Sequence, residues 1–166
     1  MRHSPGPVRI LVGVDGSPAS LSALRWAAGE AKQRHAEIVA VRSWRCLRDR
    51  TAPYAMAAHR PCHDRERERT RHALAADVRA VLGAEPPVRV HQELAYGDPV
   101  RTLLHLAAKA DLLVLGDAPA ADGGPIRMAC RRMSPCPVVL VPPGPVAAQD
   151  ADAPAAGTTA TGQCAW

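Results

Sequence analysis

The sequence predicts a three-layer α/β/α fold in which helices cover both faces of a five-stranded parallel sheet. Expected strands and helices alternate along the chain. Several of the strands are continuous Leu/Val runs bounded by Gly and Pro, as at Leu112–Leu115 and Val138–Val141, which is typical of parallel strands covered on both faces. With 166 residues, 47% of them hydrophobic, the chain has the size of one globular domain.

The first part of the chain predicts two strands joined by a long helix. Arg9 to Val14 is the first strand, and it is followed by the turn Asp15-Gly16-Ser17-Pro18. Ser17 is a suitable N-cap and Pro18 a suitable first helical residue. Glu37 to Trp44 is the second strand, and residues 45–63 predict an irregular excursion rich in Pro and small residues.

The middle of the chain predicts a helix, an edge strand and a second helix. A mixed-charge run from Arg65 opens the first helix, which Gly83 can end. Val88 to Leu94 alternates apolar and polar residues at its start, as an edge strand would. Asp98 then serves as N-cap for a helix that begins at Pro99.

The stretch from Asp111 to Pro142 predicts a β-α-β unit. A buried strand, Leu112 to Leu115, is followed by a small-residue loop, a short helix from about Ile126 to Met133 and a last strand, Val138 to Val141. Gly124-Pro125 suits a helix start, since Pro at the first helical position loses no hydrogen bond. The loop therefore faces a helix N-terminus, where backbone N–H groups favour an anion.

Three segments in this order resemble the universal stress protein family: VRILVGVDGSPAS near the start, YGDP in the middle and CPVVLVPPG near the end. The resemblance covers Val8 to Gly144 and implies the strand order 3-2-1-4-5 of the adenine nucleotide alpha hydrolase-like fold. We expect a domain over residues 8–144, a flexible N-terminus over 1–7 and a disordered tail over 145–166, which is rich in Ala, Pro, Gly and Thr.

ATP-binding members of that family carry the motif G-x2-G-x9-G-[ST] after the fourth strand. Gly116 matches its first Gly and Gly124 its third, but Pro119 stands in place of the second and Pro125 in place of the hydroxyl residue. The loop is also several residues shorter. Because Pro offers neither an N–H nor a hydroxyl to a phosphate, the resemblance implies a degenerate loop with weak or lost ATP binding.

The resemblance also supplies the candidate nucleotide site, with ATP or AMP as its ligand and no other cofactor. It implies that Asp15 contacts the nucleoside and that the backbone of Val41 flanks adenine. Two other interpretations stay open: Asp15 bonds the amides of its own turn, and Val41 is only a core residue. The candidate residues are Asp15, Gly16, Ser17, Val41, Gly116, Asp117, Gly123, Gly124 and Ile126.

Composition narrows the partners and the location. The net charge of +5 comes nearly all from Arg that is scattered along the chain without interleaved aromatics, so we expect no nucleic-acid partner. Five Cys without a CxxC pair, no secretory segment and no long apolar span predict a cytoplasmic protein away from the membrane. The segment His59-Arg60-Pro61-Cys62-His63 has zinc-type ligands but no second cluster, so we expect no metal site.

Neither a nucleophile beside a base nor a pair of carboxylates can be identified, so we do not expect an enzyme. The first hypothesis is a stress-response or regulatory protein that acts through dimerisation and protein partners. The second is an adenine-nucleotide sensor that uses the loop after the fourth strand. The third is a hydrolase using Asp117 and Asp122. The resemblance implies a homodimer through the last strand, whose residues are Val138, Val139, Leu140 and Val141.

Overall fold

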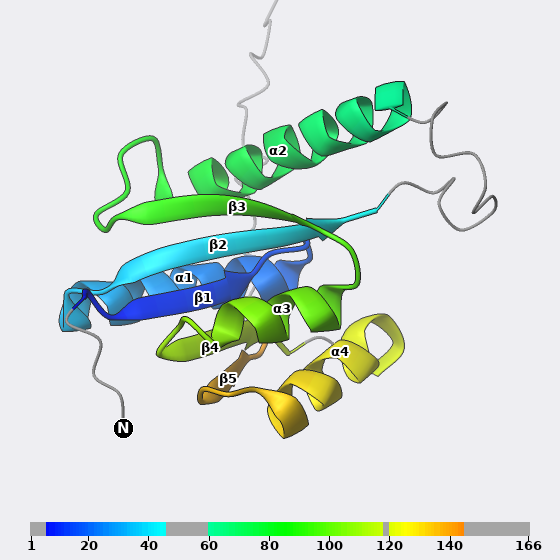
Figure 1. Ribbon diagram of the computed structural model, residues 1–166. Helices are drawn as coiled ribbons and strands as arrows, with labels where there is room; N and C mark the ends of the chain where they lie inside the picture. Colours follow the sequence, from blue (N-terminus) through cyan, green and yellow to red (C-terminus); the bar gives the residue numbers. More distant parts are fainter. Residues whose placement is uncertain (1–5, 46–59, 118–119, 145–166) are drawn as a thin grey trace, which may run out of the picture.

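The computed structural model describes residues 6–45, 60–117 and 120–144. In this part of the chain, five parallel strands form one sheet in the order β3-β2-β1-β4-β5 (Figure 1). The predicted fold class and strand order are therefore confirmed. The elements are β1 (Arg9–Gly13), α1 (Pro18–Arg34), β2 (Glu37–Trp44), α2 (Arg60–Leu82), β3 (Val90–Tyr96), α3 (Pro99–Ala107), β4 (Leu112–Gly116), α4 (Ala120–Met133) and β5 (Val138–Val141).

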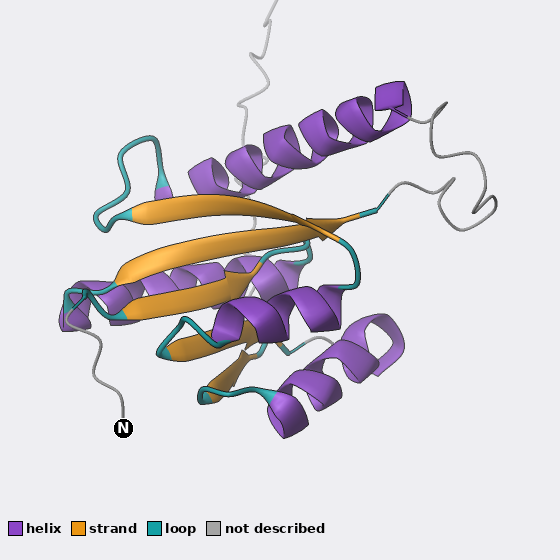
Figure 2. Ribbon diagram, in the orientation of Figure 1, coloured by secondary structure: helices purple, strands orange, loops and turns teal. Residues whose placement is uncertain are grey.

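Helices cover both faces of the sheet, as Figure 2 shows. On the face of α1 and α2, alternate residues of β1 such as Ile10 and Val12 pack with Leu24 and Leu74 in one buried cluster. On the face of α3 and α4, the intervening Leu11 joins a second buried cluster with Leu103, Leu113 and Cys130. β1 lies in the middle of the sheet, so its side chains are buried on both faces and its carboxyl end lies at the centre of one edge.

Two of the predicted helix starts are confirmed at atomic detail. The Ser17 side chain accepts a hydrogen bond from the N–H of Ser20, and Pro18 is the first residue of α1. The Asp98 carboxylate accepts from the N–H groups of Val100 and Arg101 at the start of α3. Both caps satisfy donors that no helical carbonyl can reach.

Two boundaries differ from the prediction. α2 begins at Arg60, so residues 60–63 are helical rather than part of the irregular excursion, because Pro is compatible with the first turn of a helix. β3 runs over Val90–Tyr96 instead of Val88–Leu94, since it pairs with β2 up to the contact of Trp44 with Tyr96. The excursion at 46–59 and the predicted tail at 145–166 lie outside the described residues, as do residues 1–5 of the predicted flexible N-terminus.

The start of α4 was predicted wrongly. The helix begins at Ala120 rather than near Ile126, so Pro125 lies inside it and Gly123 and Gly124 belong to its first two turns. Pro125 is the sixth residue of α4, so the helix lacks the hydrogen bond that an N–H at this position would donate to the carbonyl four residues back, and the Pro does not mark the helix start. The predicted Gly123-Gly124 helix start is therefore not the N-terminus that faces the loop.

Candidate functional site

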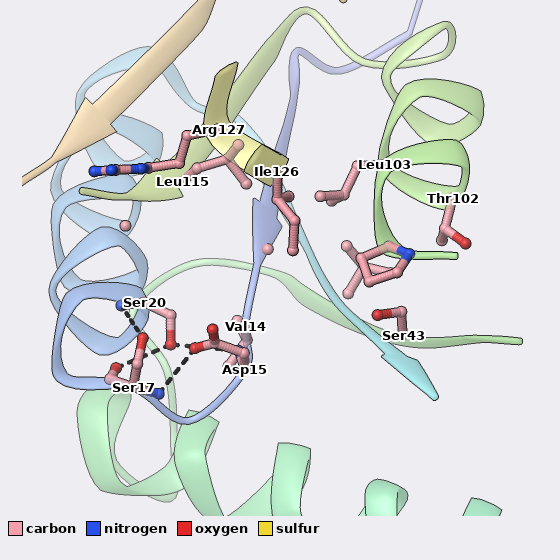
Figure 3. A pocket seen from close by; sticks show the side chains of 14 residues that line it. Val14, Asp15, Ser17, Ser20, Ser43, Thr102, Leu103, Leu115, Ile126 and Arg127 are labelled. Carbon is pink, nitrogen blue, oxygen red and sulfur yellow. Dashed lines mark hydrogen bonds between the residues drawn. The ribbon is translucent and has the colours of Figure 1, made fainter. Parts of the chain in front are cut away.

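A cavity of about 120 Å³ opens at the carboxyl ends of β1 and β4, at the point where the strand order reverses. The start of α1, the first turns of α3 and the middle of α4 complete its walls (Figure 3). Val41, Leu103, Leu115 and Ile126 give it an apolar surface, while Asp15 and serine side chains form a polar rim. Such a cavity, apolar with few polar groups, is suited to a small organic ligand.

The polar rim is a hydrogen-bonded turn between β1 and α1. Asp15 Oδ1 accepts from the N–H of Ser17 at 2.9 Å, and the Asp15 N–H donates to Ser20 Oγ at 3.3 Å. The Ser20 hydroxyl in turn donates to the Ser17 carbonyl at 3.0 Å. Figure 3 shows these three side chains turned toward one another at the rim. The turn is thus held by its own residues, which supports the interpretation of Asp15 as a turn residue.

The Asp15 carboxylate stays ionised in this setting. Partial burial raises the pKa of Asp15, but hydrogen bonds from the side chain and backbone of Ser17 and from the Ser20 side chain outweigh it, so the pKa lies below its ordinary value. Only Oδ1 is bonded to the turn backbone, and the side chain lines the cavity. An ionised carboxylate there can accept hydrogen bonds from ligand hydroxyls and disfavours an anion beside it.

Arg42 holds the turn from the outside. Its guanidinium donates to the Asp15 carbonyl at 2.9 Å and to Asp77 Oδ2 on α2 at 2.8 Å, and both side chains are largely buried. Gly16, between the two contacts, has a φ of 87°, a conformation that favours Gly, and an added Cβ would lie 3.3 Å from Arg42 Nη2. Sequence analysis did not identify Arg42, because nothing local to β2 indicates its partners.

Gly116 lets β4 approach the first turn of α1. An ideal Cβ at this position would lie 2.5 Å from the backbone C of Ala19 and 2.6 Å from the backbone N of Ser20. No real Cβ approaches backbone so closely. Gly116, which was expected as the first Gly of a phosphate loop, is therefore needed for packing. Any role in ligand binding would be additional.

An ion pair lies across the connection from β4 to α4. The Arg127 guanidinium donates to Asp117 Oδ1, and the Asp117 N–H donates to the Val141 carbonyl at 2.6 Å. Arg127 lines the cavity with a side chain only 17% exposed, whereas that of Asp117 is 44% exposed. A cation therefore stands on the side of the cavity where the sequence predicts a phosphate loop.

The structure brings five of the predicted site residues into the cavity wall: Asp15, Ser17, Val41, Gly116 and Ile126. Gly16 and Asp117 are adjacent in sequence to lining residues, and Gly124 is two positions before the lining residue Ile126, but none of the three lines the cavity. For Gly123 and Asp122 the structure describes the helical backbone of α4 but not their surroundings. Four polar residues that line the cavity were not predicted from the sequence: Ser20, Ser43, Thr102 and Arg127. Only Ser20 had a local signal, because it lies three residues after the cap residue Ser17.

Within the described part of the chain, no group of three or more His, Cys, Asp or Glu side chains is placed to hold a metal ion. His63 is described and packs edge-on against Trp44, with 5.9 Å between ring centroids, while His59 lies outside the described residues. None of the described helices combines the length and apolarity needed to span a membrane.

Comparison with known proteins identifies the family. Residues 8–142 match the family model described as the universal stress protein family. The chain belongs to this family. The universal stress protein Rv2623 of Mycobacterium tuberculosis (strain ATCC 25618 / H37Rv) is 32% identical over 144 residues, which cover 80% of this chain and 46% of that protein. This universal stress protein domain thus spans about half the length of the curated relatives it matches.

Solved structures agree with the fold. The universal stress protein UspA from Lactobacillus plantarum has a TM-score of 0.65 at 23% identity, covering 83% of this chain and 99% of that one. A universal stress protein family protein from Arabidopsis thaliana, solved with AMP bound, has a TM-score of 0.56 at 14% identity, covering 84% of this chain and 94% of that one. At these identities the likeness shows the fold alone.

Proposed function

We propose that this universal stress protein domain is a stress-response regulatory protein that acts through dimerisation and partner binding, with weak or lost ATP binding. The connection from β4 to α4 carries this proposal. It spans only residues 117–119, its Asp117 N–H is already bonded to Val141, and Pro119 has no N–H. A triphosphate needs several free N–H donors from such a loop, and Asp117 and Pro119 supply none.

The size of the cavity supports the same proposal. Its volume of about 120 Å³ is small beside the ~300–1,000 Å³ of typical ligand pockets. Arg127 and Asp117 pair on the side where the phosphates would leave the cavity toward the loop. ATP binding would require this pair to open.

The edge strand β5 supports dimerisation. Among the described strands β5 pairs only with β4, and Val138, Val139 and Leu140 remain half-buried. On α4, Met128 and Met133 are 60% and 58% exposed. An apolar strand edge invites pairing unless something covers it, and a second copy related by a two-fold axis is one way to cover it.

Light scattering over a concentration series tests the dimer. We expect the mass of a dimer at tens of micromolar for the wild type and of a monomer for Val138→Lys, since a charge on an edge strand opposes pairing. Circular dichroism of the variant must show a folded chain for the comparison to count. A wild type that stays monomeric across the series contradicts dimerisation through β5.

The second candidate function is an adenine-nucleotide sensor. The convergence of Asp15, Val41, Gly116 and Ile126 on one apolar cavity favours it, and the fold relative from Arabidopsis thaliana binds AMP. Thermal unfolding with AMP, adenosine and magnesium ATP tests both candidates. A ligand at a hundred times its dissociation constant adds about 2.7 kcal/mol to the unfolding free energy. A rise of the unfolding midpoint with AMP and none with ATP supports a sensor that has lost ATP binding. If no nucleotide or nucleoside raises the midpoint, dimerisation and partner binding remain as the proposed function.

We propose no catalytic role. A hydrolase would need a residue free to orient water, and the carboxylate of Asp117 is engaged by Arg127. Phosphate release from ATP should stay at the background rate. Release that exceeds background and disappears in Asp117→Asn would establish the hydrolase instead.

A further inference from the structure

The cavity has one cationic side chain among the lining residues that the structure describes, and it is Arg127. Figure 3 shows Arg127 extending from α4 toward α1, apart from the Asp15 rim, with Leu115 and Ile126 beside it. Its side chain is 17% exposed, and its guanidinium Nη1 contacts Asp117 Oδ1. An arginine that lines a cavity with a largely buried side chain is suited to bind an anion, since the planar fork of its guanidinium matches phosphate oxygens.

On the basis of the nucleotide-sensor candidate, we propose that Arg127 binds a single anionic group of the ligand, such as one phosphate, and that Asp117 is the internal counter-ion which this group displaces. Asp117 is suited to this role because its side chain is 44% exposed. When the ligand takes its place, the carboxylate can turn into water without a large desolvation penalty. The site therefore exchanges one anion for another at a partly buried cation.

The charges around the cavity set how many anionic groups it can take. Asp15 on the opposite rim is ionised, because its hydrogen bonds lower the pKa. Arg42 lies outside the cavity wall and is committed to Asp77 and the Asp15 carbonyl. One cation remains for the ligand, so a second or third phosphate would lie near carboxylates without a matching charge.

The arrangement of the other lining residues suggests what is attached to the anion. Between Arg127 and Thr102, which lie on different sides in Figure 3, the wall is formed by Leu115, Ile126 and Leu103. Asp15 offers an acceptor to hydroxyl groups near the rim. The order of these surfaces matches a ligand with one phosphate, a hydroxyl-bearing middle and a flat apolar end, which describes a nucleoside monophosphate. The cavity of about 120 Å³ must widen to admit such a ligand.

Isothermal titration calorimetry on the full chain tests the role of Arg127 with three probes: AMP, adenosine and inorganic phosphate. We expect Arg127→Met to lower the affinity for AMP by about tenfold or more, which is the value of a hydrogen-bonded charge contact. The affinity for adenosine should stay unchanged. We expect Asp117→Asn to raise the affinity for AMP several-fold, because the carboxylate that competes for Arg127 is gone. Arg131→Met is the matched control, since Arg131 lies one turn further along α4, is exposed, and does not line the cavity.

The outcomes separate this role from the nucleotide function itself. If adenosine and AMP bind equally well and Arg127→Met changes neither, the cavity takes a nucleoside but Arg127 does not bind its anion. If phosphate binds in an Arg127-dependent way and adenosine does not bind, the anion site stands and the nucleotide sensor falls. If Asp117→Asn binds AMP no better than the wild type, the counter-ion role is wrong. If no probe binds wild type or Asp117→Asn, both proposals fall.

Discussion

Replacing Gly116 by Ala tests whether this residue is needed for packing, independently of any ligand. The added Cβ would lie 2.5 Å and 2.6 Å from backbone atoms of Ala19 and Ser20. Both neighbours belong to the first turn of α1, whose cap is bonded to the Asp15 turn, so they cannot rotate away as a side chain would. Overpacking of this kind costs about 1–3 kcal/mol of unfolding free energy.

Two further glycines provide matched controls. At Gly13 an added Cβ would lie 2.7 Å from Leu115 Cδ2, the far end of a flexible side chain, so Gly13→Ala should cost less than Gly116→Ala. At Gly29, on the exposed side of α1, an added Cβ would meet nothing within 4 Å. Gly29→Ala should raise the unfolding free energy by about 0.5–1 kcal/mol, because Ala loses less backbone freedom in a helix.

Urea denaturation followed by far-UV circular dichroism measures all three variants. A shift of the midpoint at constant slope reports a change in stability alone. From most to least stable, the expected order is Gly29→Ala, wild type, Gly13→Ala and Gly116→Ala. A Gly116→Ala protein as stable as the wild type would refute the packing role, and loss of AMP binding without loss of stability would assign Gly116 to the ligand.

Four further substitutions probe the turn that forms the rim and the arginine that holds it. Arg42→Met should lower the unfolding free energy by about 1–3 kcal/mol. A double-mutant cycle with Asp77→Leu, measured by urea denaturation, should show that the two effects are coupled. Additive effects would show that the two side chains act independently. Ser17→Ala should cost about 1 kcal/mol through loss of the α1 cap, measured as a lower midpoint in the same titration. For Asp15 the folded pKa is lowered, so the ionised carboxylate contributes stability that is present above the pKa of the unfolded chain and is lost as pH falls through the folded value. The stability difference between wild type and Asp15→Asn should therefore shrink on acidification, and a difference that grows toward low pH would contradict the sign of the shift.

The elements with strong local signals could be predicted from sequence. β2 and β5 have the predicted bounds, and the caps at Ser17 and Asp98 form as expected. Apolar runs, Pro at a first helical position and a side-chain oxygen before it act over a few residues, so spacing alone reveals them. The strand order came from the resemblance of three ordered segments, which together describe the whole domain.

The start of α4 shows where a local rule was insufficient. Gly124-Pro125 has the composition of a helix start, and yet the helix begins at Ala120. Pro favours the first turn of a helix, but in α4 it is the sixth residue, and local composition does not reveal that the helix starts upstream of it. The start of α4 also sets the length of the loop between β4 and α4, on which phosphate binding depends.

The sequence by itself determined the fold class, most of the elements and five of the residues that line the cavity. Only the tertiary structure decided what those residues touch. Arg42 reaches Asp15 and Asp77, which are 27 and 35 positions away, and Gly116 is needed because of α1, nearly a hundred residues earlier. Arg127 borders the cavity because α4 packs there, and no spacing in its own segment indicates the cavity. Such contacts depend on how elements distant in sequence pack against each other, and a local pattern contains no information about that.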